Sequence, residues 1–370
     1  MKIYPSAPGT SYVSPSAVKT AVVLMSGGVD STAAAWLLKR DGWQVIGLTM
    51  TIPGQGGPSG PAVESAAAAA LAMSVPHFIA DLEDEFRGLV IDPFAAAYLA
   101  GRTPNPCAGC NARLKFGLLW DAADEYFGPV HLASGHYARV LSAGGQRALA
   151  RGADLEKDQS YFLYGIQKER LARLLMPLGE LCKESVRAIA EEAGLEAAGK
   201  KDSMEICFAS EGGYRQLLES SPGAPGQIVD ETGKVLGRHG GVRNFTVGQR
   251  KGLGIASRNG LHVLHMDGEN NRIVVGPRER VFSRFVEAGD INILLPDMLA
   301  EGADLFGKTR SRGEPSPLKI VSFQDGILKV RFEEPQFAPA PGQCLVIYGE
   351  SGLVAGGGVI RRLHGEDSGF

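Results

Sequence analysis

The sequence lacks the features of a membrane or secreted protein. No apolar stretch among its 370 residues approaches the roughly 20 residues that a membrane-spanning helix needs. Residues 1–18 are rich in Ser and Pro, without the basic start and apolar core of a signal peptide or the Arg-rich pattern of a transit peptide. The five cysteines are an odd number, which argues against a disulfide framework. We therefore expect a cytoplasmic protein without membrane association, whose cysteines serve metal binding or thiol chemistry.

An excess of positive charge is also missing. The chain has 38 Lys and Arg against 41 Asp and Glu, a formal net charge of −3. This balance does not indicate a nucleic-acid-binding protein, whose usual footprint is a basic surface. It does not exclude one, because a large enzyme can carry a local basic patch on an acidic body.

Short apolar runs alternate with helical patterns in the first half of the chain. Residues 21–25 (AVVLM) are typical of a buried parallel strand, and a Gly-containing turn separates them from a helix over 32–40. We expect a kink at Pro93 and a helix end at Gly194. Such alternation predicts an α/β fold with a doubly wound parallel sheet. The other expected elements are strands at 44–50, 75–80 and 130–134 and helices at 65–73, 85–99, 111–126 and 158–193.

The pattern changes after about residue 210, where Gly and Pro become frequent and helical periodicity fades. Short alternating runs separated by turn residues then predict an all-β C-terminal domain, a small barrel. These runs are 272–275, 318–323, 327–332 and 343–348. The expected domains are a catalytic domain at 1–211, a small central domain at 212–279 and the barrel at 280–370.

A glycine-containing loop, Ser26-Gly27-Gly28-Val29-Asp30-Ser31, lies between a predicted strand and a predicted helix. Its glycines let backbone N–H groups face an anion, and the helix directs its positive end to the same place. Asp30 is suited to holding Mg²⁺ beside a pyrophosphate. No Lys follows the glycines, so this is not the GxxxxGK[ST] loop. The hexamer resembles the PP-loop of enzymes that cleave ATP between its α- and β-phosphates; the alternative is a tight turn without a ligand.

Three cysteines are candidates for chemistry. Cys107 and Cys110 form a CxxC turn, and we expect Cys110 at the start of a helix, where the thiolate is favoured. Cys207 follows Lys200 and Lys201, whose charges should also favour a thiolate. No second CxxC or His pair completes a zinc site. The remaining cysteines, Cys182 in a helical segment and Cys344 in a barrel strand, are predicted to be packing residues.

Segments over nearly the whole chain resemble those of tRNA-specific 2-thiouridylases, bacterial enzymes that thiolate the wobble uridine of tRNAs for Lys, Glu and Gln. The resemblance implies ATP and Mg²⁺ as cofactors and tRNA as substrate. It also implies a sulfur donor, which would be a cysteine desulfurase, a sulfur-relay protein or free sulfide. The matching segments are SGGVDS at Ser26, GRTPNPCxxCN at Gly101, ASGHYAR at Ala133, KDQSYFLY at Lys157, PLGE at Pro177, KKDSxxICF at Lys200, FTVGQRKGLGI at Phe245 and PGQ at Pro341.

The resemblance also implies roles for individual residues. Cys207 resembles the residue that receives sulfur as a persulfide, and Cys110 resembles its partner nucleophile. ATP would be bound by Leu24, Met25, Ser26, Gly27, Gly28, Val29, Asp30, Ser31, Met50 and Gly135. Asn105, Pro106 and Cys107 would lie against the target base, and further tRNA contacts would come from His136, Lys157, Asp158, Gln159, Arg310, Arg312 and Gln343.

The implied chemistry begins with adenylation of the uracil C2 oxygen, which converts a poor leaving group into AMP. The persulfide on Cys207 then attacks C2 itself, or Cys110 frees hydrosulfide that attacks instead. Both routes leave a Cys110–Cys207 disulfide, which must be reduced before the next turnover.

The chain departs from the family pattern at several positions. Met204 and Glu205 replace Gln and Gly before Cys207, and a Gly/Pro stretch follows Met50. Cys107 stands where some members have Asp. Cys107, Cys110 and Cys207 could therefore be three ligands of a [4Fe–4S] cluster whose fourth iron binds hydrosulfide. This hypothesis competes with the persulfide, because Cys207 cannot ligate iron and carry sulfur at once, and the sequence leaves both open.

Two other functions remain as alternatives. A PP-loop ligase acting on a small molecule would need neither the barrel nor the paired cysteines. A non-catalytic tRNA- or Fe–S-binding relative would bind tRNA without ATP turnover, and the intact loop and the three cysteines argue against it.

Overall fold

The computed structural model describes residues 1–10, 12, 19–195, 199, 207–208, 224–255, 260–300 and 302–361. The chain forms two compact units, and each unit is assembled from separate stretches of sequence. The first takes in residues 1–90, 107–210 and 352–354, and the second takes in 91–106, 211–351 and 355–370. Among the described residues, none of the helices has the length and apolar character required to cross a membrane.

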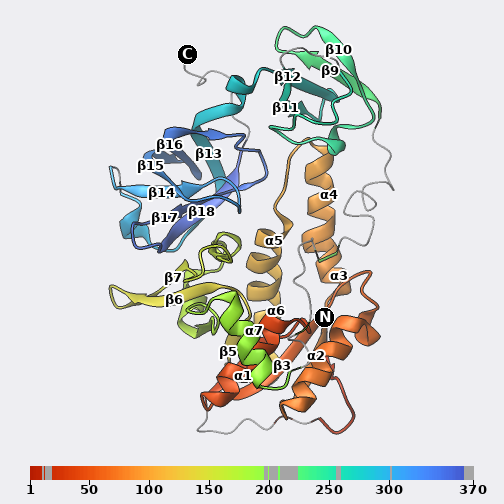
Figure 1. Ribbon diagram of the computed structural model, residues 1–370, viewed down its shortest axis with the longest axis vertical. Coiled ribbons are helices and arrows are strands. Elements are labelled where there is room, and N and C mark those ends of the chain that lie inside the picture. Colours follow the sequence, from red (N-terminus) through yellow and green to blue (C-terminus); the bar gives the residue numbers. More distant parts are fainter. Residues whose placement is uncertain are drawn as a thin grey trace. The chain divides into compact units, whose positions relative to one another are not determined.

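A six-stranded sheet with the order β1-β4-β3-β2-β5-β8 forms the centre of the first unit (Figure 1). Apart from β1, which runs antiparallel to β4, all neighbouring strands are parallel. The predicted doubly wound sheet is therefore confirmed, and its inner strands are buried apolar runs. The strands are β1 (Lys2–Pro5), β2 (Thr20–Leu24), β3 (Gln44–Thr51), β4 (His77–Asp81), β5 (His131–Ser134) and β8 (Leu174–Leu175).

Helices α1 (Val29–Arg40), α2 (Pro61–Ala72) and α7 (Lys183–Glu192) share one hydrophobic core with the sheet. Small side chains such as Ala33 and Ala66, both fully buried, let the helices approach the strands closely. Both α1 and α2 begin a few residues before the expected ranges. Shorter helices of this unit are α3 (Glu83–Phe86), α5 (Pro106–Gly109) and α6 (Leu119–Phe127).

Two stretches are wound as π-helix, η2 (Arg87–Ile91) and η3 (Cys110–Leu118). The helix expected over 85–99 is divided by η2, which ends just before Pro93 in the first turn of α4 (Asp92–Leu99). The helix expected over 111–126 begins earlier, at α5, and continues through η3 into α6. Gly117 in η3 has non-helical backbone angles (φ −108°, ψ −106°).

The prediction of a long helix over 158–193 is wrong. Within this range only α7 is an α-helix. It is preceded by two 3-10 turns, Ser160–Phe162 and Lys168–Arg173, and by the short strand β8. The side chain of Asp158 accepts hydrogen bonds from the backbone N–H groups of Gly152 and Ser160, both at 3.0 Å, which stabilises a turn in place of a helix. The predicted helix end at Gly194 is confirmed, with φ +64°. An unpredicted hairpin, β6 (Ala138–Ala143) and β7 (Gln146–Arg151), precedes this segment.

The second unit contains a four-stranded sheet and a closed six-stranded barrel, as expected for an all-β C-terminal part (Figure 1). The barrel has its own apolar core, in which Val286, Val330 and Phe332 are fully buried. This unit also includes residues 91–106, which the sequence analysis placed in the catalytic domain. The sheet has the order β10 (Val235–His239), β9 (Gly226–Asp230), β12 (Arg272–Gly276), β11 (His262–Asp267), and the barrel has the order β13 (Phe282–Ile293), β16 (Ile327–Phe337), β15 (Ser316–Gln324), β14 (Leu305–Lys308), β17 (Cys344–Tyr348), β18 (Val354–Ile360).

Candidate active site

The loop at residues 26–31 connects β2 to α1 and is fixed by its own hydrogen bonds. The Ser31 hydroxyl accepts from the Ser26 backbone N–H at 3.1 Å and donates to the Gly28 carbonyl at 3.1 Å. Ser65 in α2 donates to the Gly27 carbonyl at 3.0 Å. Gly27 has φ +72°, and a Cβ there would lie 2.7 Å from the Ala62 carbonyl oxygen. The backbone of this turn is thus held in a shape that only glycine permits at position 27.

The loop lies where the strand order of the sheet reverses. From β2 the chain proceeds to β3 and β4 on one side, and β5 pairs with β2 on the other. Gly135 follows β5, and a Cβ on it would lie 2.6 Å from the Ser31 backbone nitrogen. Met50 is the penultimate residue of β3, at the same carboxyl end of the sheet. In open α/β sheets this reversal point is the usual ligand crevice, so the predicted nucleotide residues are placed together there.

The carboxylate of Asp30 is engaged from two sides. Lys183 donates to its two oxygens at 2.7 and 2.8 Å, and the Tyr137 hydroxyl donates at 2.8 Å. Lys183 is only 5% exposed, so its ammonium is fixed beside the loop. A divalent cation at Asp30 would therefore share the carboxylate with Lys183. Sequence reasoning missed Lys183, because no local pattern indicates an ion pair between residues 153 positions apart.

Cys110 is the first residue of η3, as expected, but α5 runs directly into η3, so Cys110 is not at a free helix N-terminus. Helix α5 begins at Pro106, which places Cys107 in the first turn and Cys110 at the α5–η3 junction. Cys110 is 6% exposed, and this burial raises the pKa of its thiol to about 11, although the Lys115 ammonium acts in the opposite direction. Cys110 is therefore a neutral thiol at neutral pH, and the predicted thiolate is not present in this state.

Cys207 and Phe208 are attached to the first unit by two contacts. The Gln55 side-chain amide donates to the Cys207 carbonyl at 2.6 Å, and the Phe208 ring packs edge-on against Phe86 at 5.6 Å. Desolvation of the sulfur raises the pKa of the Cys207 thiol, with the Lys115 ammonium again opposing it. The effect expected of Lys200 and Lys201 on this thiol stays a prediction. The preceding residues Lys200, Lys201, Met204 and Glu205 lie outside the described residues.

The three thiols lie near enough to affect one another's pKa, although about 100 residues separate Cys207 from Cys107 and Cys110. The charges of Cys107 and Cys207 both act on the Cys110 thiol, the charge of Cys207 acts on Cys107, and Lys115 acts on all three. All five cysteines are free. Across the described part of the chain, no three His, Cys, Asp or Glu side chains are grouped to hold a metal ion. The described residues thus do not present a ligand set for a [4Fe–4S] cluster, and the three cysteines are free thiols in this structure.

Cys110 should react slowly with alkylating agents. With a pKa of about 11, only about one thiol in a thousand is ionised at pH 8, and the rate should rise about tenfold per pH unit up to pH 10. Iodoacetamide labelling followed by peptide mass spectrometry measures this, with the exposed Cys182 as internal control. Labelling of Cys110 as fast as that of Cys182 at pH 8 would contradict the structure.

In the first unit, the residues predicted to contact tRNA differ in their availability. The His136 ring lies 2.8 Å from the Ser134 hydroxyl and packs on Phe116; burial and the Lys115 charge lower its pKa to about 3, so it is neutral. The Asp158 side chain is 1% exposed and pairs with Arg151 at 3.2 Å. Asp158 therefore shapes the loop from inside. Of its two neighbours, Gln159 accepts from the Tyr137 N–H at 2.9 Å and Lys157 is half-buried.

In the second unit, Gln343 supports the segment that precedes Asn105 and Pro106. Its side-chain amide donates to the Thr103 carbonyl at 3.0 Å, and the Thr103 N–H donates to the Pro341 carbonyl at 2.8 Å. Gln343 thus stabilises the segment that is predicted to contact the base. Among the other predicted tRNA residues of this unit, Arg310 and Arg312 are exposed.

The two remaining cysteines have different surroundings. Cys344 is 2% exposed in β17, which confirms it as a packing residue. Cys182 is exposed at the residue before α7, with its sulfur 3.0 Å from the Ser185 hydroxyl. The packing role predicted for Cys182 is therefore wrong, because the helix expected around it begins only at Lys183.

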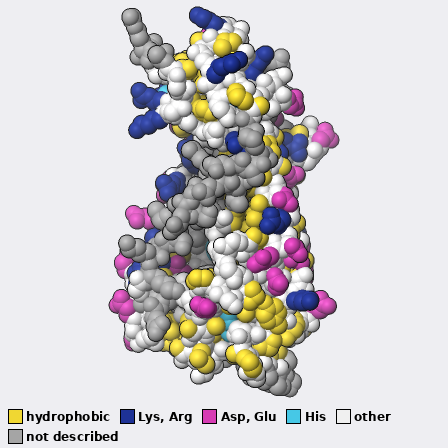
Figure 2. Space-filling model, turned by 90° about the vertical axis from the view of Figure 1, so that its right-hand side faces the viewer, with side chains coloured by type: hydrophobic (Ala, Val, Ile, Leu, Met, Phe, Trp, Pro, Cys, Tyr) yellow, Lys and Arg dark blue, Asp and Glu magenta, His cyan; other side chains and the backbone are white. Residues whose placement is uncertain are grey.

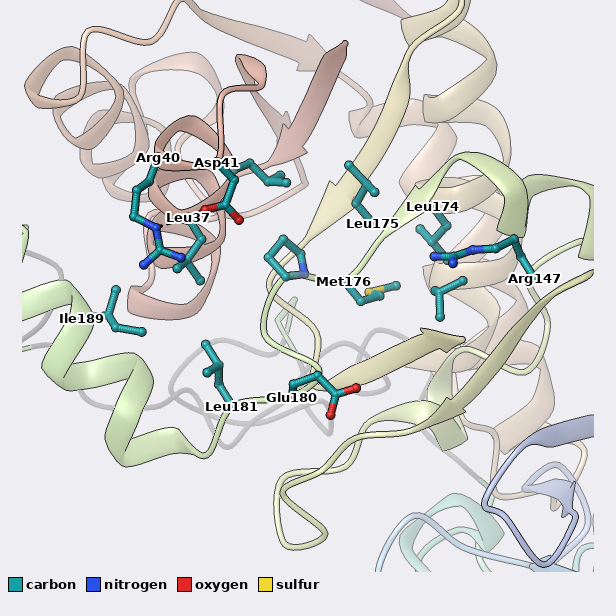
Figure 3. A pocket seen from close by; sticks show the side chains of 13 residues that line it. Leu37, Arg40, Asp41, Arg147, Leu174, Leu175, Met176, Glu180, Leu181 and Ile189 are labelled. Atoms are coloured by element: carbon teal, nitrogen blue, oxygen red, sulfur yellow. Dashed lines mark hydrogen bonds and ion pairs between the residues drawn. The ribbon is translucent and has the colours of Figure 1, made fainter. Parts of the chain in front are cut away.

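A cavity of about 410 Å³ lies in the first unit, between the end of α1, β8 and α7 (Figure 3). Its lining combines aliphatic side chains such as Leu37, Leu181 and Ile189 with the charged Arg147 and Glu180. None of the residues predicted to bind nucleotide, sulfur or tRNA lines it, so it is separate from the candidate site.

Three family models match successive parts of the chain. They are described as a tRNA methyl transferase HUP domain (residues 19–211), a tRNA methyl transferase PRC-barrel domain (215–277) and an aminomethyltransferase beta-barrel domain (284–360). Curated relatives named tRNA-specific 2-thiouridylase MnmA, from Brucella melitensis biotype 1 and Brucella ovis, are each 40% identical over 359 residues, covering 92% of this chain and 90% of theirs. A solved U34-tRNA thiolase NcsA from Methanococcus maripaludis has 18% identity and a TM-score of 0.34 over 55% of this chain and 65% of its own.

Proposed function

Because the chain belongs to the tRNA-specific 2-thiouridylase family, we propose that it replaces the C2 oxygen of a tRNA uridine with sulfur in an ATP-dependent reaction. The observation that carries the proposal is that one unit holds both the phosphate-binding turn and the three thiols. The target is the wobble uridine of the tRNAs for Lys, Glu and Gln, and the enzyme works in the cytoplasm.

The turn at residues 26–31 would bind the ATP phosphates. The turn and the positive N-terminal end of α1 lie at the reversal point of the sheet, where a pyrophosphate would be stabilised as it leaves. Mg²⁺ bound at Asp30 would neutralise charge on the phosphates. Lys183 keeps a second, fixed positive charge next to the same carboxylate.

The first step joins the uracil C2 oxygen to the α-phosphorus of ATP and breaks the bond to the β-phosphate, which releases pyrophosphate. In the persulfide route, the terminal sulfur on Cys207 then bonds to C2, and AMP leaves with the original oxygen. The Cys110 thiolate next attacks the Cys207 sulfur, and the electron pair of the broken S–S bond becomes part of the C2 thiocarbonyl. In the hydrosulfide route, Cys110 attacks the persulfide first and releases the hydrosulfide that attacks C2.

Both routes oxidise two thiols to a disulfide, so a thiol reductant must act in each cycle, and a desulfurase or a relay protein must supply sulfur that is already at the persulfide level. Free sulfide, the third donor considered, would instead attack C2 directly and displace AMP without forming a disulfide. Both disulfide-forming routes also require Cys110 to lose its proton, which its raised pKa opposes in the resting state. A change in the surroundings of this thiol on substrate binding would increase the thiolate fraction and so speed formation of the disulfide.

The target uridine would enter the site splayed out from its neighbours, as is usual for recognition of single-stranded loops. Asn105, Pro106 and Cys107 form the chain segment that would meet the base. The neutral imidazole of His136, with Lys157 and Gln159, would contact the adjoining nucleotides, and Asp158 would keep their loop in shape.

An anaerobic assay tests the proposal. The protein, unmodified tRNA, ATP, Mg²⁺, a cysteine desulfurase with cysteine as the persulfide donor, and a thiol reductant should yield 2-thiouridine, quantified by mass spectrometry, with pyrophosphate release that requires tRNA. Pyrophosphate release without tRNA and without 2-thiouridine would replace the proposal by a small-molecule ligase, and tRNA binding without ATP turnover by a non-catalytic protein. Product from iron-reconstituted but not from iron-free protein would make the three cysteines cluster ligands.

A further inference from the structure

Two arginines of the second unit contact one aromatic ring. The guanidinium carbon of Arg278 lies 5.8 Å from the ring centre of Phe337 at the end of β16, and that of Arg310 lies 5.5 Å from it. Arg278 also lies 5.0 Å from the ring of Phe282, which packs against Phe337. Arg310 donates to the Phe337 and Ala338 carbonyls. These contacts hold both side chains in place without a carboxylate.

A histidine adjoins this ring, and Arg250 lies near that part of the chain, because a Cβ at Gly260, two residues before His262, would lie 3.1 Å from the Arg250 Nε. The His262 imidazole lies 6.5 Å from Phe337, and the charges of Arg250 and Arg278 both act on it. His262 is 7% exposed, and its Nδ1 has no hydrogen-bond partner among the residues that the structure describes. We refer to Arg250, Arg278 and Arg310 as the arginine cluster.

The positive charge of the arginine cluster is not neutralised by ion pairs. All three side chains are exposed, and in the described ranges none is paired with a carboxylate, although Glu279 also acts on His262. The neighbouring Arg280 differs, since it forms a fork with Glu231 at 2.9 and 3.0 Å. Figure 2 shows Lys and Arg side chains at the upper end of the displayed face. On a chain with a net charge of −3, this local excess indicates an anion-binding surface.

We propose that the arginine cluster binds the phosphate backbone of the RNA substrate. The inference rests on the proposed function and extends the predicted tRNA contact of Arg310 to Arg250 and Arg278. Guanidinium groups match phosphate oxygens with paired hydrogen bonds, and the aromatic contacts pre-order them. Backbone contacts of this kind carry no sequence information; they set the position of the RNA on the protein. The arginine cluster is thus a positioning surface, distinct from the residues that meet the target base.

The test is the salt dependence of tRNA binding by the full chain. Arg278→Ala should weaken binding about five- to tenfold at 150 mM salt, and it should reduce the slope of log Kd against log salt by about 0.7–0.9, the value for one lost phosphate contact. Arg250→Ala should act similarly and provides an independent variant. Arg280→Ala is the matched control. It removes the same charge two residues away from Arg278, and the arginine that it removes is already paired with Glu231. Its affinity and slope should match those of the unchanged protein.

The outcomes separate the two proposals. If the unchanged protein does not bind tRNA at low salt, the proposed function fails. If it binds, and Arg278→Ala and Arg250→Ala retain its affinity and slope, only the arginine cluster is excluded. An equal loss in Arg280→Ala would reduce the effect to general charge and would also overturn the inference. Circular dichroism melting curves confirm that each variant is folded.

Discussion

The Cys207→Ser variant should lose 2-thiouridine formation by about 1,000-fold or more, a loss typical of removing an essential nucleophile. Its pyrophosphate release in the presence of tRNA should persist, because adenylation depends on the loop at residues 26–31 and not on the thiol. Product is quantified by mass spectrometry of digested tRNA, and pyrophosphate by a coupled assay. Loss of 2-thiouridine formation with retained pyrophosphate release is the expected signature of a sulfur carrier.

The matched variants sharpen this experiment. Cys182→Ser changes an exposed thiol outside the cysteine group and should keep full activity. Cys110→Ser should trap a protein–RNA adduct joined through sulfur between Cys207 and C2 if the persulfide attacks directly, and a reductant should release it. Absence of the adduct together with lost product would favour free hydrosulfide, while normal activity of Cys207→Ser would remove Cys207 from the mechanism.

Gly135→Ala should have the second-largest effect, an approximately 100-fold fall in ATP-dependent pyrophosphate release. The added Cβ would lie 2.6 Å from the Ser31 nitrogen and 2.7 Å from the Asp30 carbonyl carbon, and side chains do not approach backbone so closely. The loop would have to move, and a displacement of about 1 Å at a reacting site commonly costs 100-fold in rate. Steady-state kinetics with varied ATP measure the change in kcat and KM.

Gly88→Ala provides the control for this substitution. A Cβ at Gly88 meets no atom within 4 Å, and the residue has no positive φ, so activity and melting temperature should be unchanged. A Gly135→Ala variant with unchanged kinetics would mean that the end of β5 does not limit the position of the nucleotide loop.

Elements with a dominant apolar pattern could be predicted from the sequence. The strands at Thr20–Leu24 and Gln44–Thr51 are mostly apolar and buried, and the barrel strands alternate between turn residues, so the apolar pattern predicts them. The prediction failed for the segment before α7, because its apolar residues are buried without forming a helix, around turns that Asp158 stabilises. Hydrophobic periodicity does not distinguish a series of buried turns from a helix.

Individual residues of the candidate site could be predicted from the sequence, but the interactions between distant residues could not. The position of Cys110 could have been inferred correctly, since Pro106 is typical of the first turn of a helix and so places the helix start earlier. The Asp30–Lys183 ion pair and the common effect of Lys115 on three thiols arise only when distant segments fold together. The protonation state of Cys110 depends on this burial, which is why the sequence predicted the opposite.

The interleaving of the two units limits how this protein can be dissected. Residues 352–354 belong to the first unit, where the Arg151 N–H donates to the Gly352 carbonyl at 3.0 Å and Ala150 bridges to Leu353. Residues 91–106 leave the first unit and return immediately before Cys107. A fragment cut at residue 211 would therefore lack backbone partners for its own hairpin, and the isolated remainder would lack α4. Excising the barrel to obtain a minimal sulfur-transfer domain should thus require a redesigned chain, since no single cut leaves either half intact.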